Sequence, residues 1–308
     1  MNGIIILILA LLLDIALGEP SNRCHPVAWL GKLISFQLKF VPKTGNLRQF
    51  AYGAGTVLLT ASVIASPLYF GLHVLQNWNA VVYTIICAYL LKNTFSLRGL
   101  WSAVQKVKEC LIRDDIDNAR LEVTALVSRH TEDLSRQQLI SASIESCAEN
   151  LCDSFVAPLL YYAVFGLPGA IIYRIINTFD AMIGFHGRWE YTGKFAARLD
   201  DVVNYIPARI SSLFIVLASL YTGRAANGWQ AMLKEHKKTE SPNAGWTMGA
   251  MAGTLGIELE KAGAYRLGTG TVELSTAAVS RSQVIVLLAA ALWSLVIIAA
   301  EVVISVAR

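Results

Sequence analysis

Three polar clusters lie within residues 141–209 of a chain that is 55% hydrophobic. In the first cluster, the carboxylates Glu145, Glu149 and Asp153 would share one helix face at i, i+4 and i+8. Like charges at such spacing destabilise a helix by about 0.2–0.5 kcal/mol per pair, so we expect a cation to offset the repulsion. In order, the clusters contain Glu145, Glu149, Asn150 and Asp153; Asn177 and Asp180; and Arg198, Asp200, Asp201, Asn204 and Arg209.

A solvated helix face is the simpler interpretation of such acids. However, apolar segments at 155–162 and 169–176 separate the clusters, and Pro158, Gly166, Pro168 and Gly169 interrupt them. Charges beside broken apolar segments are typical of a cavity. A Mg²⁺ ion bridged to phosphates would suit that cavity, because Mg²⁺ takes one or two carboxylates together with substrate phosphate oxygens. On the residues alone both interpretations stay open.

The composition is that of a membrane protein. Of the 308 residues 16% are charged, and the mean hydropathy is +0.49, whereas roughly 25% of residues are charged in soluble domains. The net charge of +4 is ordinary for a membrane protein, because cytoplasmic loops collect Lys and Arg, and it does not indicate nucleic-acid binding. The five cysteines are odd in number and lack metal-ligand spacing, so we expect reduced thiols.

The apolar runs predict an all-α, polytopic integral membrane protein that forms one membrane-embedded domain over residues 1–308. Runs at 2–17, 51–72, 79–97 and 283–306 are close to the roughly 20 residues that cross a bilayer. Runs at 155–176 and 206–221 contain breakers, and we expect re-entrant or broken segments there. Residues 98–153 read as a helical insert, with helix starts at 114–117, before a helix over 119–127, and at 131–134.

Positive charge predicts the orientation. Lys and Arg concentrate in residues 18–50, 98–153 and 223–282, and none occurs at 73–78. By the positive-inside rule the three basic segments are cytoplasmic and both termini lie outside. The first run lacks the basic start of a cleavable signal peptide, so we expect it to be retained. The protein is then a multi-pass protein of the cell membrane with its active site on the cytoplasmic side.

Two shorter motifs flank the clusters. Asp14, Gly18 and Glu19 precede His25 at the end of the first run; the simpler interpretation is that Gly and Pro end a helix there and that the histidine is packed. Ser-Pro-Asn-Ala-Gly-Trp at 241–246 can bring backbone N–H groups close to an anion, or can be a plain loop. The small residues that follow, up to 256, allow close approach to a ligand or to another helix. Walker A, GxGxxG, HExxH and GxSxG motifs are absent from the sequence.

Taken together, five ordered motifs resemble the adenosylcobinamide-phosphate synthase family of cobalamin biosynthesis. They are the segment at 14–31, Glu-Ser-Cys-Ala-Glu-Asn at 145–150, Asn-Thr-Phe-Asp at 177–180, Ala-Arg-Leu-Asp-Asp at 197–201 and the 241–246 motif. The resemblance covers about residues 11–268. His130, Ser154 and Thr247 depart from the family pattern, so His130 is not assigned as a site residue.

The resemblance implies a multi-pass membrane enzyme that joins an amino-alcohol phosphate, such as aminopropanol phosphate, to the free propionate of adenosylcobyric acid. ATP would drive amide formation, and the transferred phosphoryl group would need Mg²⁺. The expected partners are therefore these two substrates and the lipid bilayer, with a second copy or other cobalamin-pathway enzymes as further candidates.

We assign roles to the polar residues by side-chain chemistry. Glu149, Asp153 and Asp180 are the expected Mg²⁺ ligands, followed by Asp200 and Asp201, and Glu145 or Asp201 would take the proton of the amine. Basic residues expected to hold phosphates or carboxylates are Arg174, Lys194, Arg198 and Arg209. Residues expected to orient substrate are His25, Asn150, Asn177, Asn204, Ser241, Asn243 and Gly245.

Two other functions are compatible with the same pattern. A transporter also carries broken apolar segments that are lined with charge. A non-enzymatic membrane sensor on the same scaffold would bind ligand without turnover. The family resemblance favours the enzyme.

Overall fold

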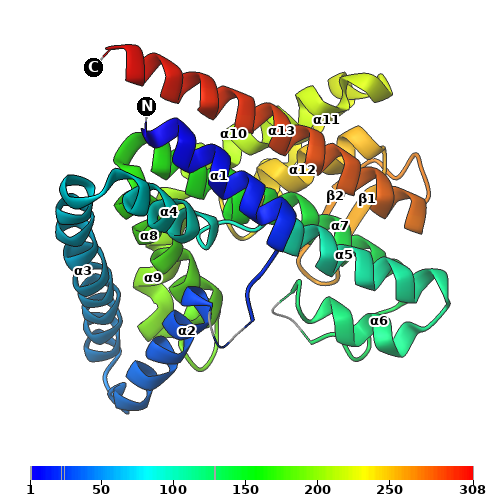
Figure 1. Ribbon diagram of the computed structural model, residues 1–308. Coiled ribbons are helices and arrows are strands. Elements are labelled where there is room, and N and C mark those ends of the chain that lie inside the picture. The colour runs from blue at the N-terminus through cyan, green and yellow to red at the C-terminus, as the bar shows by residue number, and fades with distance from the viewer. Residues whose placement is uncertain (1, 22, 24, 128–129, 308) are drawn as a thin grey trace. The chain divides into compact units, whose positions relative to one another are not determined.

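In the computed structural model (Figure 1), residues 2–21, 23, 25–127 and 130–307 are described. Residues 22 and 24 of the 14–31 motif lie outside that range. Contacts group the chain into two compact units. Unit 1 comprises Met1–Ser96, Ala157–Val203 and Ile297–Arg308, and unit 2 comprises Leu97–Val156 and Asn204–Val296. Segments of the two units alternate along the chain. The single membrane-embedded domain over residues 1–308 stays a prediction.

Unit 1 is helical. Helix α1 packs on α4, and α9 packs on α3 and α8 (Figure 1). The helices are α1 (Asn2–Leu17), α2 (Pro26–Gln37), α3 (Asn46–Trp78), α4 (Ala80–Lys92), α8 (Ala157–Ile183) and α9 (Glu190–Val203), with a 3₁₀ turn at Leu38–Phe40. Its core joins α2, α3, α8 and α9 through Leu30, Ile34, Val57, Ile175, Phe179, Ile183 and Ala196.

Asn79 separates two of these helices. Its extended backbone ends α3, and its side-chain oxygen accepts hydrogen bonds from the N–H groups of Val81 and Val82 at 3.0 and 3.1 Å. Such capping satisfies donors that would otherwise have no partner at the start of α4. The predicted run at 79–97 therefore divides into α4, a turn, and the start of the next helix.

Gly166 interrupts α8. Its φ of 68° and ψ of −166° are open to glycine and strained for other residues, and Pro168 follows in the next turn. The predicted break in segment 155–176 is confirmed at this glycine. The depth of the segment in a membrane stays a prediction.

Unit 2 is also mainly helical and contains one antiparallel hairpin of β1 (Glu258–Lys261) and β2 (Tyr265–Gly268). The all-α class is confirmed, although the hairpin was not predicted. The helices are α5 (Leu97–Ile112), α6 (Ile116–Val123), α7 (Arg136–Leu151), α10 (Tyr205–Ala218), α11 (Ala225–Glu235), α12 (Ala244–Leu255) and α13 (Thr276–Ala307, which continues into unit 1), with a π turn at Cys152–Val156 and 3₁₀ turns at Ser219–Thr222 and His236–Lys238.

The helical insert is confirmed with corrected boundaries. Asp115 caps α6 by accepting from the N–H of Asn118 at 3.2 Å, as the acidic start predicts, but α6 ends at Val123 rather than at 127. The predicted start at 131–134 is wrong, because those residues form a turn closed by Leu134 N–H to the Thr131 carbonyl at 3.2 Å. Ser135 and Gln138 form a reciprocal capping box that starts α7 at Arg136 instead.

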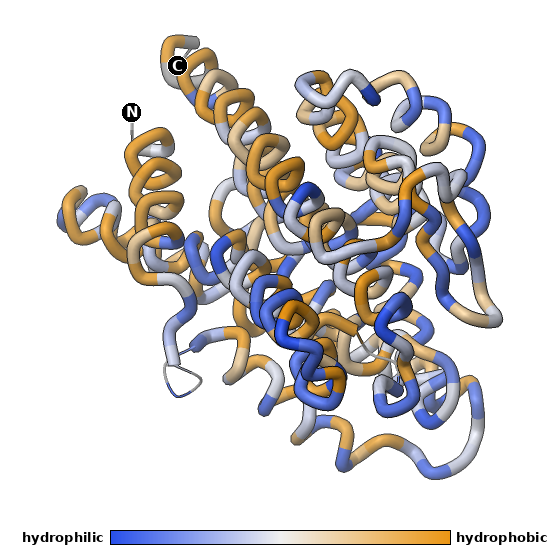
Figure 2. Tube along the Cα trace, turned by 90° about the vertical axis from the view of Figure 1, so that its right-hand side faces the viewer, coloured by the Kyte–Doolittle hydropathy of each residue, from blue (hydrophilic) through white to orange (hydrophobic). Residues whose placement is uncertain are grey.

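Among the described residues, five helices are long and apolar enough to cross a membrane: Asn46–Trp78, Ala80–Ile112, Arg136–Ile183, Tyr205–Thr222 and Thr276–Val303. Figure 2 shows hydrophobic residues along most of α1 and of the C-terminal helix, and Gly3–Leu17 is a shorter apolar helix. Pro207, one of the breakers in the run at 206–221, does not interrupt the helix, because α10 begins at Tyr205 and places the proline in its first turn, where proline is tolerated.

The small residues after 244 pack helix against helix. A Cβ added to Gly249 would lie 3.3 Å from the Met232 Cα and 3.5 Å from the Ala231 carbonyl oxygen, both in α11. A Cβ on Gly245 would collide with the carbonyl oxygen of His236. This stripe therefore serves the close packing of α12 on α11 and on the turn at His236–Lys238.

Candidate functional site

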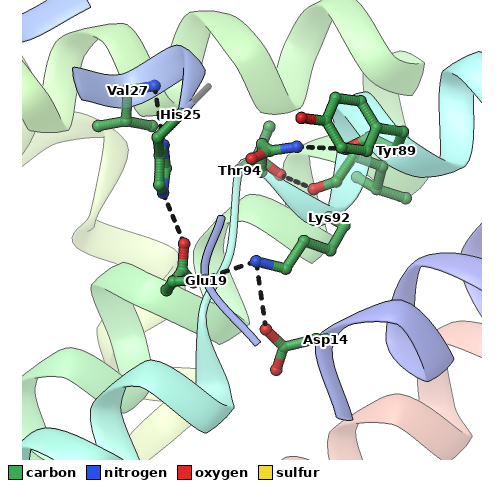
Figure 3. A network of polar contacts seen from close by, with 9 residues as sticks. Asp14, Glu19, His25, Val27, Tyr89, Lys92 and Thr94 are labelled. Carbon is green, nitrogen blue, oxygen red and sulfur yellow. Dashed lines mark hydrogen bonds and ion pairs between the residues drawn. The ribbon is translucent and has the colours of Figure 1, made fainter. Parts of the chain in front are cut away.

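Four charged or titratable side chains of unit 1 converge where α1 ends, α2 begins and α4 ends. Figure 3 shows the Lys92 ammonium between the carboxylates of Asp14 and Glu19, with His25 on the far side of Glu19. Lys92 Nζ lies 3.8 Å from Asp14 Oδ1 and 3.2 Å from Glu19 Oε1. His25 Nε2 lies 2.5 Å from Glu19 Oε2. We call Asp14, Glu19, His25 and Lys92 the lysine cluster.

Both ring nitrogens of His25 are occupied. Nδ1 accepts a hydrogen bond from the Val27 N–H at 3.1 Å and thereby caps α2, so Nδ1 carries no proton. The proton of the neutral ring then lies on Nε2 and is donated to Glu19. His25 thus fixes the start of α2 and holds Glu19, and its ring would have to release one contact to bind substrate as predicted.

Burial differs across the lysine cluster. The side chains of Lys92 and Asp14 are only 4% and 3% exposed, whereas 33% of Glu19 is exposed. Burial would raise the pKa of Glu19, but hydrogen bonds from His25 and Ser96 and the charge of Lys92 outweigh it and lower the pKa to about 2. Glu19 is therefore a fixed negative charge at neutral pH. Lys92 was not predicted as a site residue, although a single lysine inside the apolar run 79–97 was a usable signal.

A second polar group of unit 1 contains three predicted residues. Arg174 Nη1 donates to Asn177 Oδ1 at 3.3 Å, and Asn177 Nδ2 donates to Asp200 Oδ1 at 3.4 Å. Asp200 is buried, and Asp180 and Asp201 are half-buried. Lys194 lies 6.0 Å from the Tyr191 ring centre, and Arg198 is exposed. The structure thus brings Arg174, Asn177 and Asp200 together across α8 and α9.

Glu145 in unit 2 is held by hydroxyl groups. Ser141 Oγ donates to Oε1 at 2.6 Å and Tyr265 OH donates to Oε2 at 2.9 Å. The Glu260 N–H in turn donates to Ser141 Oγ at 2.8 Å. Glu145 is 5% exposed, and its carboxylate ties α7 to the hairpin β1–β2.

Arg209 and Asn243 meet although they are far apart in the sequence. Arg209 Nη1 donates to Asn243 Oδ1 at 2.9 Å, and its guanidinium lies 3.5 Å from the Tyr205 ring centre and 4.7 Å from that of Trp246. Trp246 also stacks on His236 at 4.2 Å. The predicted Ser241 accepts a hydrogen bond from the Asn243 N–H at 3.2 Å. A planar guanidinium in contact with two aromatic rings is well suited to hold an oxyanion at its edge.

Glu149 and Asp153 lie half-buried at the junction of α7 and the π turn. Asn150 between them donates to Ser146 and accepts from Ser154 Oγ at 3.3 Å, and Asn204 accepts from Cys152 Sγ at 3.8 Å. Over the described ranges, no group of three or more His, Cys, Asp or Glu side chains could hold a metal ion. Glu149 and Asp153 nevertheless fit Mg²⁺ in donor chemistry, because that ion needs only one or two carboxylates when phosphates complete its shell.

The predicted site residues are thus divided between the units, and the metal set Glu149, Asp153 and Asp180 stays a prediction. Unit 1 holds His25, Arg174, Asn177, Asp180, Lys194, Arg198, Asp200 and Asp201. Unit 2 holds Glu145, Glu149, Asn150, Asp153, Asn204, Arg209, Ser241, Asn243 and Gly245.

Fold and polar clusters together define a polytopic, helical membrane protein that keeps charged side chains among apolar helices, a feature of sites for polar ligands. The profile of the family described as CobD/Cbib protein matches residues 7–302. The chain belongs to this family of cobalamin biosynthesis proteins, as its motifs predict. It is 45% identical over 298 residues to the cobalamin biosynthesis protein CobD of Dehalococcoides mccartyi, with 96% of each chain covered.

A further relative is the probable cobalamin biosynthesis protein CobD of Methanocaldococcus jannaschii. It is 39% identical over 276 residues, which cover 88% of this chain and 90% of that protein. The corresponding protein of Methanococcus aeolicus is 39% identical over 280 residues, covering 89% and 90%. No solved structure matches the chain.

Proposed function

We propose that the protein forms an amide bond, with consumption of ATP, between an amino-alcohol phosphate such as aminopropanol phosphate and the free propionate of adenosylcobyric acid. The product is adenosylcobinamide phosphate. The observation that carries this proposal is the family match over residues 7–302 to proteins of cobalamin biosynthesis. The polar clusters within apolar helices supply the charged groups that such a reaction needs.

Joining a carboxylate to an amine at neutral pH requires an activated carboxylate. In the simplest scheme the propionate oxygen attacks the γ-phosphorus of ATP and ADP leaves. The amine nitrogen then attacks the acyl carbon, phosphate leaves, and one proton is released. Bound Mg²⁺ would neutralise charge on the transferred phosphoryl group. Glu149, Asp153 and Asp180 are the carboxylates that we propose for it.

The other roles follow from the contacts. The Arg209 guanidinium, which contacts the rings of Tyr205 and Trp246, is suited to hold a phosphate or carboxylate. Asn243 orients the guanidinium by accepting a hydrogen bond from it. Both oxygens of Glu145 are engaged by hydroxyl groups. We propose Glu145 or Asp201 as the group that takes the amine proton, and Glu145 would have to release one hydroxyl donor to do so. We also propose that these groups act on the cytoplasmic side, where the positive-inside rule places the basic segments.

The decisive assay incubates the purified protein in detergent with adenosylcobyric acid, ATP, Mg²⁺ and a set of amino-alcohol phosphates, and reads products by mass spectrometry. We expect ATP-dependent formation of the amide with one preferred amino-alcohol. Substrate flux into proteoliposomes without ATP-dependent product would favour the transporter instead. Binding with neither flux nor product would favour the sensor.

Variants test the carboxylate assignment. Glu149→Gln, Asp153→Asn and Asp180→Asn should each abolish turnover while the protein still inserts and folds. Asp117→Asn is a matched control, since it removes one carboxylate whose side chain is 91% exposed. Near-normal activity of all three variants at low Mg²⁺ would refute the metal assignment and leave the overall reaction untouched.

A further inference from the structure

The lysine cluster carries one negative charge more than its buried ion pair requires. Lys92 and Asp14, at 4% and 3% exposure, form a neutral pair inside the unit. Glu19 adds a second carboxylate at 3.2 Å from the same ammonium. Since His25 Nδ1 accepts from the Val27 N–H, the ring is counted without charge and the cluster has a net charge of −1.

Glu19 differs from the other two charges in where it comes from. Lys92 is the last residue of α4 and Asp14 lies within α1, whereas Glu19 belongs to the connection between α1 and α2. Its side chain is also the most exposed of the three, at 33%. The structure therefore offers one carboxylate that can leave the ammonium without unwinding a helix.

Lys92 has donors to spare. Among the described residues its Nζ makes no well-aligned hydrogen bond: Glu19 Oε1 lies at 3.2 Å and Asp14 Oδ1 at 3.8 Å, so at most one of its N–H groups serves these two carboxylates. A buried ammonium carries three N–H groups, and leaving them unused is costly. An oxyanion with several lone pairs would use them better than the bent contact to Glu19.

We propose that Lys92 is an oxyanion-binding residue and that Glu19 is its exchangeable counter-ion. Adding an anion to the intact cluster would raise its charge to −2, which the apolar surroundings disfavour. Exchanging the Glu19 carboxylate for a singly charged ligand carboxylate or phosphate leaves the net charge around Lys92 unchanged at −1, and His25 retains Glu19 at the rim through Nε2. The choice of a carboxylate or phosphate monoester as ligand rests on the proposed function, in which both occur.

The test measures anion binding to the full-length protein in detergent by calorimetry, with inorganic phosphate and propionate as separate probes and without ATP or corrinoid. Glu19 competes with the probe for the Lys92 ammonium. Glu19→Gln removes this competing charge and should therefore tighten the binding of at least one probe by about tenfold. Tightening with phosphate alone would identify a phosphate monoester as the ligand, with propionate alone a carboxylate, and with both an unselective oxyanion site.

Glu190→Gln is the matched control. Glu190 is 34% exposed and contacts the ring of His186, as Glu19 contacts His25, but it lies beside this histidine instead of the buried lysine. Its removal should leave the binding of both probes within about twofold. A general change in surface charge would instead tighten binding equally in the two variants and overturn the proposal.

Loss of the lysine completes the test. Because Lys92→Gln alone leaves Asp14 buried without its cation, the double variant Asp14→Asn/Lys92→Gln keeps the interior neutral. It should lose at least tenfold in probe affinity relative to the wild type, which carries the same Glu19. Unchanged affinity in the double variant, weaker binding in Glu19→Gln, or no binding of either probe to any variant would each overturn the proposal. None of these results depends on whether amide ligation is observed.

Discussion

Two buried carboxylates show that the two units compensate interior charge differently. Asp14 in unit 1 is 2% exposed as a whole residue and faces a buried lysine. Glu145 in unit 2 is 5% exposed and accepts hydrogen bonds from two neutral hydroxyl groups. A lysine supplies a full opposite charge, while hydroxyl groups supply only dipoles. The lysine cluster thus depends on charge balance, and the Glu145 network depends on exact placement of donors from α7 and the hairpin.

This difference predicts unequal costs for removing a partner. Without its lysine, the buried charge of Asp14 would lose an opposing cation in an apolar interior, where the desolvation penalty is several kcal/mol. Without one hydroxyl group, Glu145 would keep its other donor. Removing one member of the charge pair should therefore cost much stability, and removing the second member should restore most of it. Removing one hydroxyl donor should cost less stability.

The largest effect is expected from Lys92→Met. It should lower the free energy of unfolding in detergent by about 3–5 kcal/mol, because it leaves a buried carboxylate without its cation. Thermal unfolding followed by circular dichroism measures the change. The double variant Asp14→Asn/Lys92→Met should recover most of the loss, and a double variant as unstable as the single one would show that the pair is not held by charge.

Gly249→Leu should cost about 1–3 kcal/mol, because side-chain atoms would be forced into the contact between α11 and α12 that positions the start of α12 and Asn243. The control is Gly71→Leu in α3, where an added Cβ meets no atom within 4 Å. If Gly249→Leu kept its stability and weakened only substrate binding, the stripe would line a ligand instead of a helix.

Much of the fold follows from the sequence because apolar length and helix breakers act locally. The boundaries of α1 and the break at Gly166 were predicted from such signals. The start of α7 was not, because Thr131 and Ser135 both precede acceptable helix sequences and only Ser135 has Gln138 in reach for a reciprocal cap. The hairpin escaped prediction because its strands have only four residues each, too few for a clear alternation.

The site is less predictable because its contacts join distant parts of the chain. Tyr265 lies 120 positions from Glu145, and nothing in either segment signals the other. Lys92 was overlooked because one charge hardly changes the hydropathy of an apolar run. By contrast, the contact between Arg209 and Asn243 joins two residues that had been assigned to the same substrate-binding set. Residue type indicates which side chains could serve such a site, and only the fold shows which of them contact one another.

Tyr265→Phe tests the hydroxyl side of the comparison. Removing the O–H that donates to Glu145 Oε2 should cost about 1–2 kcal/mol, since a buried acceptor loses one donor. Denaturant unfolding of the detergent-solubilised protein measures it, and Tyr191→Phe at an exposed tyrosine is the control. A loss as large as that of Lys92→Met would contradict the distinction between charge pairs and hydroxyl donors.

The smallest effect concerns acid stability at Glu19. Its pKa in the folded protein is about 2, below the ordinary value of 4.5, so folding favours the ionised form. The stabilisation is complete above about pH 4.5 and is lost as the pH falls from there toward 2. The stability difference between the wild type and Glu19→Gln should therefore be constant near neutrality and shrink through this window. Because a third of the Glu19 side chain is in water, this stability difference will be smaller than the one expected for the buried pair of Lys92 and Asp14.

The control is Glu190→Gln, which removes a similarly exposed carboxylate beside His186 and provides the reference curve of stability against pH. If the stability difference between the wild type and Glu19→Gln stayed flat from neutrality to pH 2, the Glu19 carboxylate would gain no stability from Lys92, His25 and Ser96. The contrast between charge balance in unit 1 and hydroxyl donors in unit 2 would then not extend to Glu19.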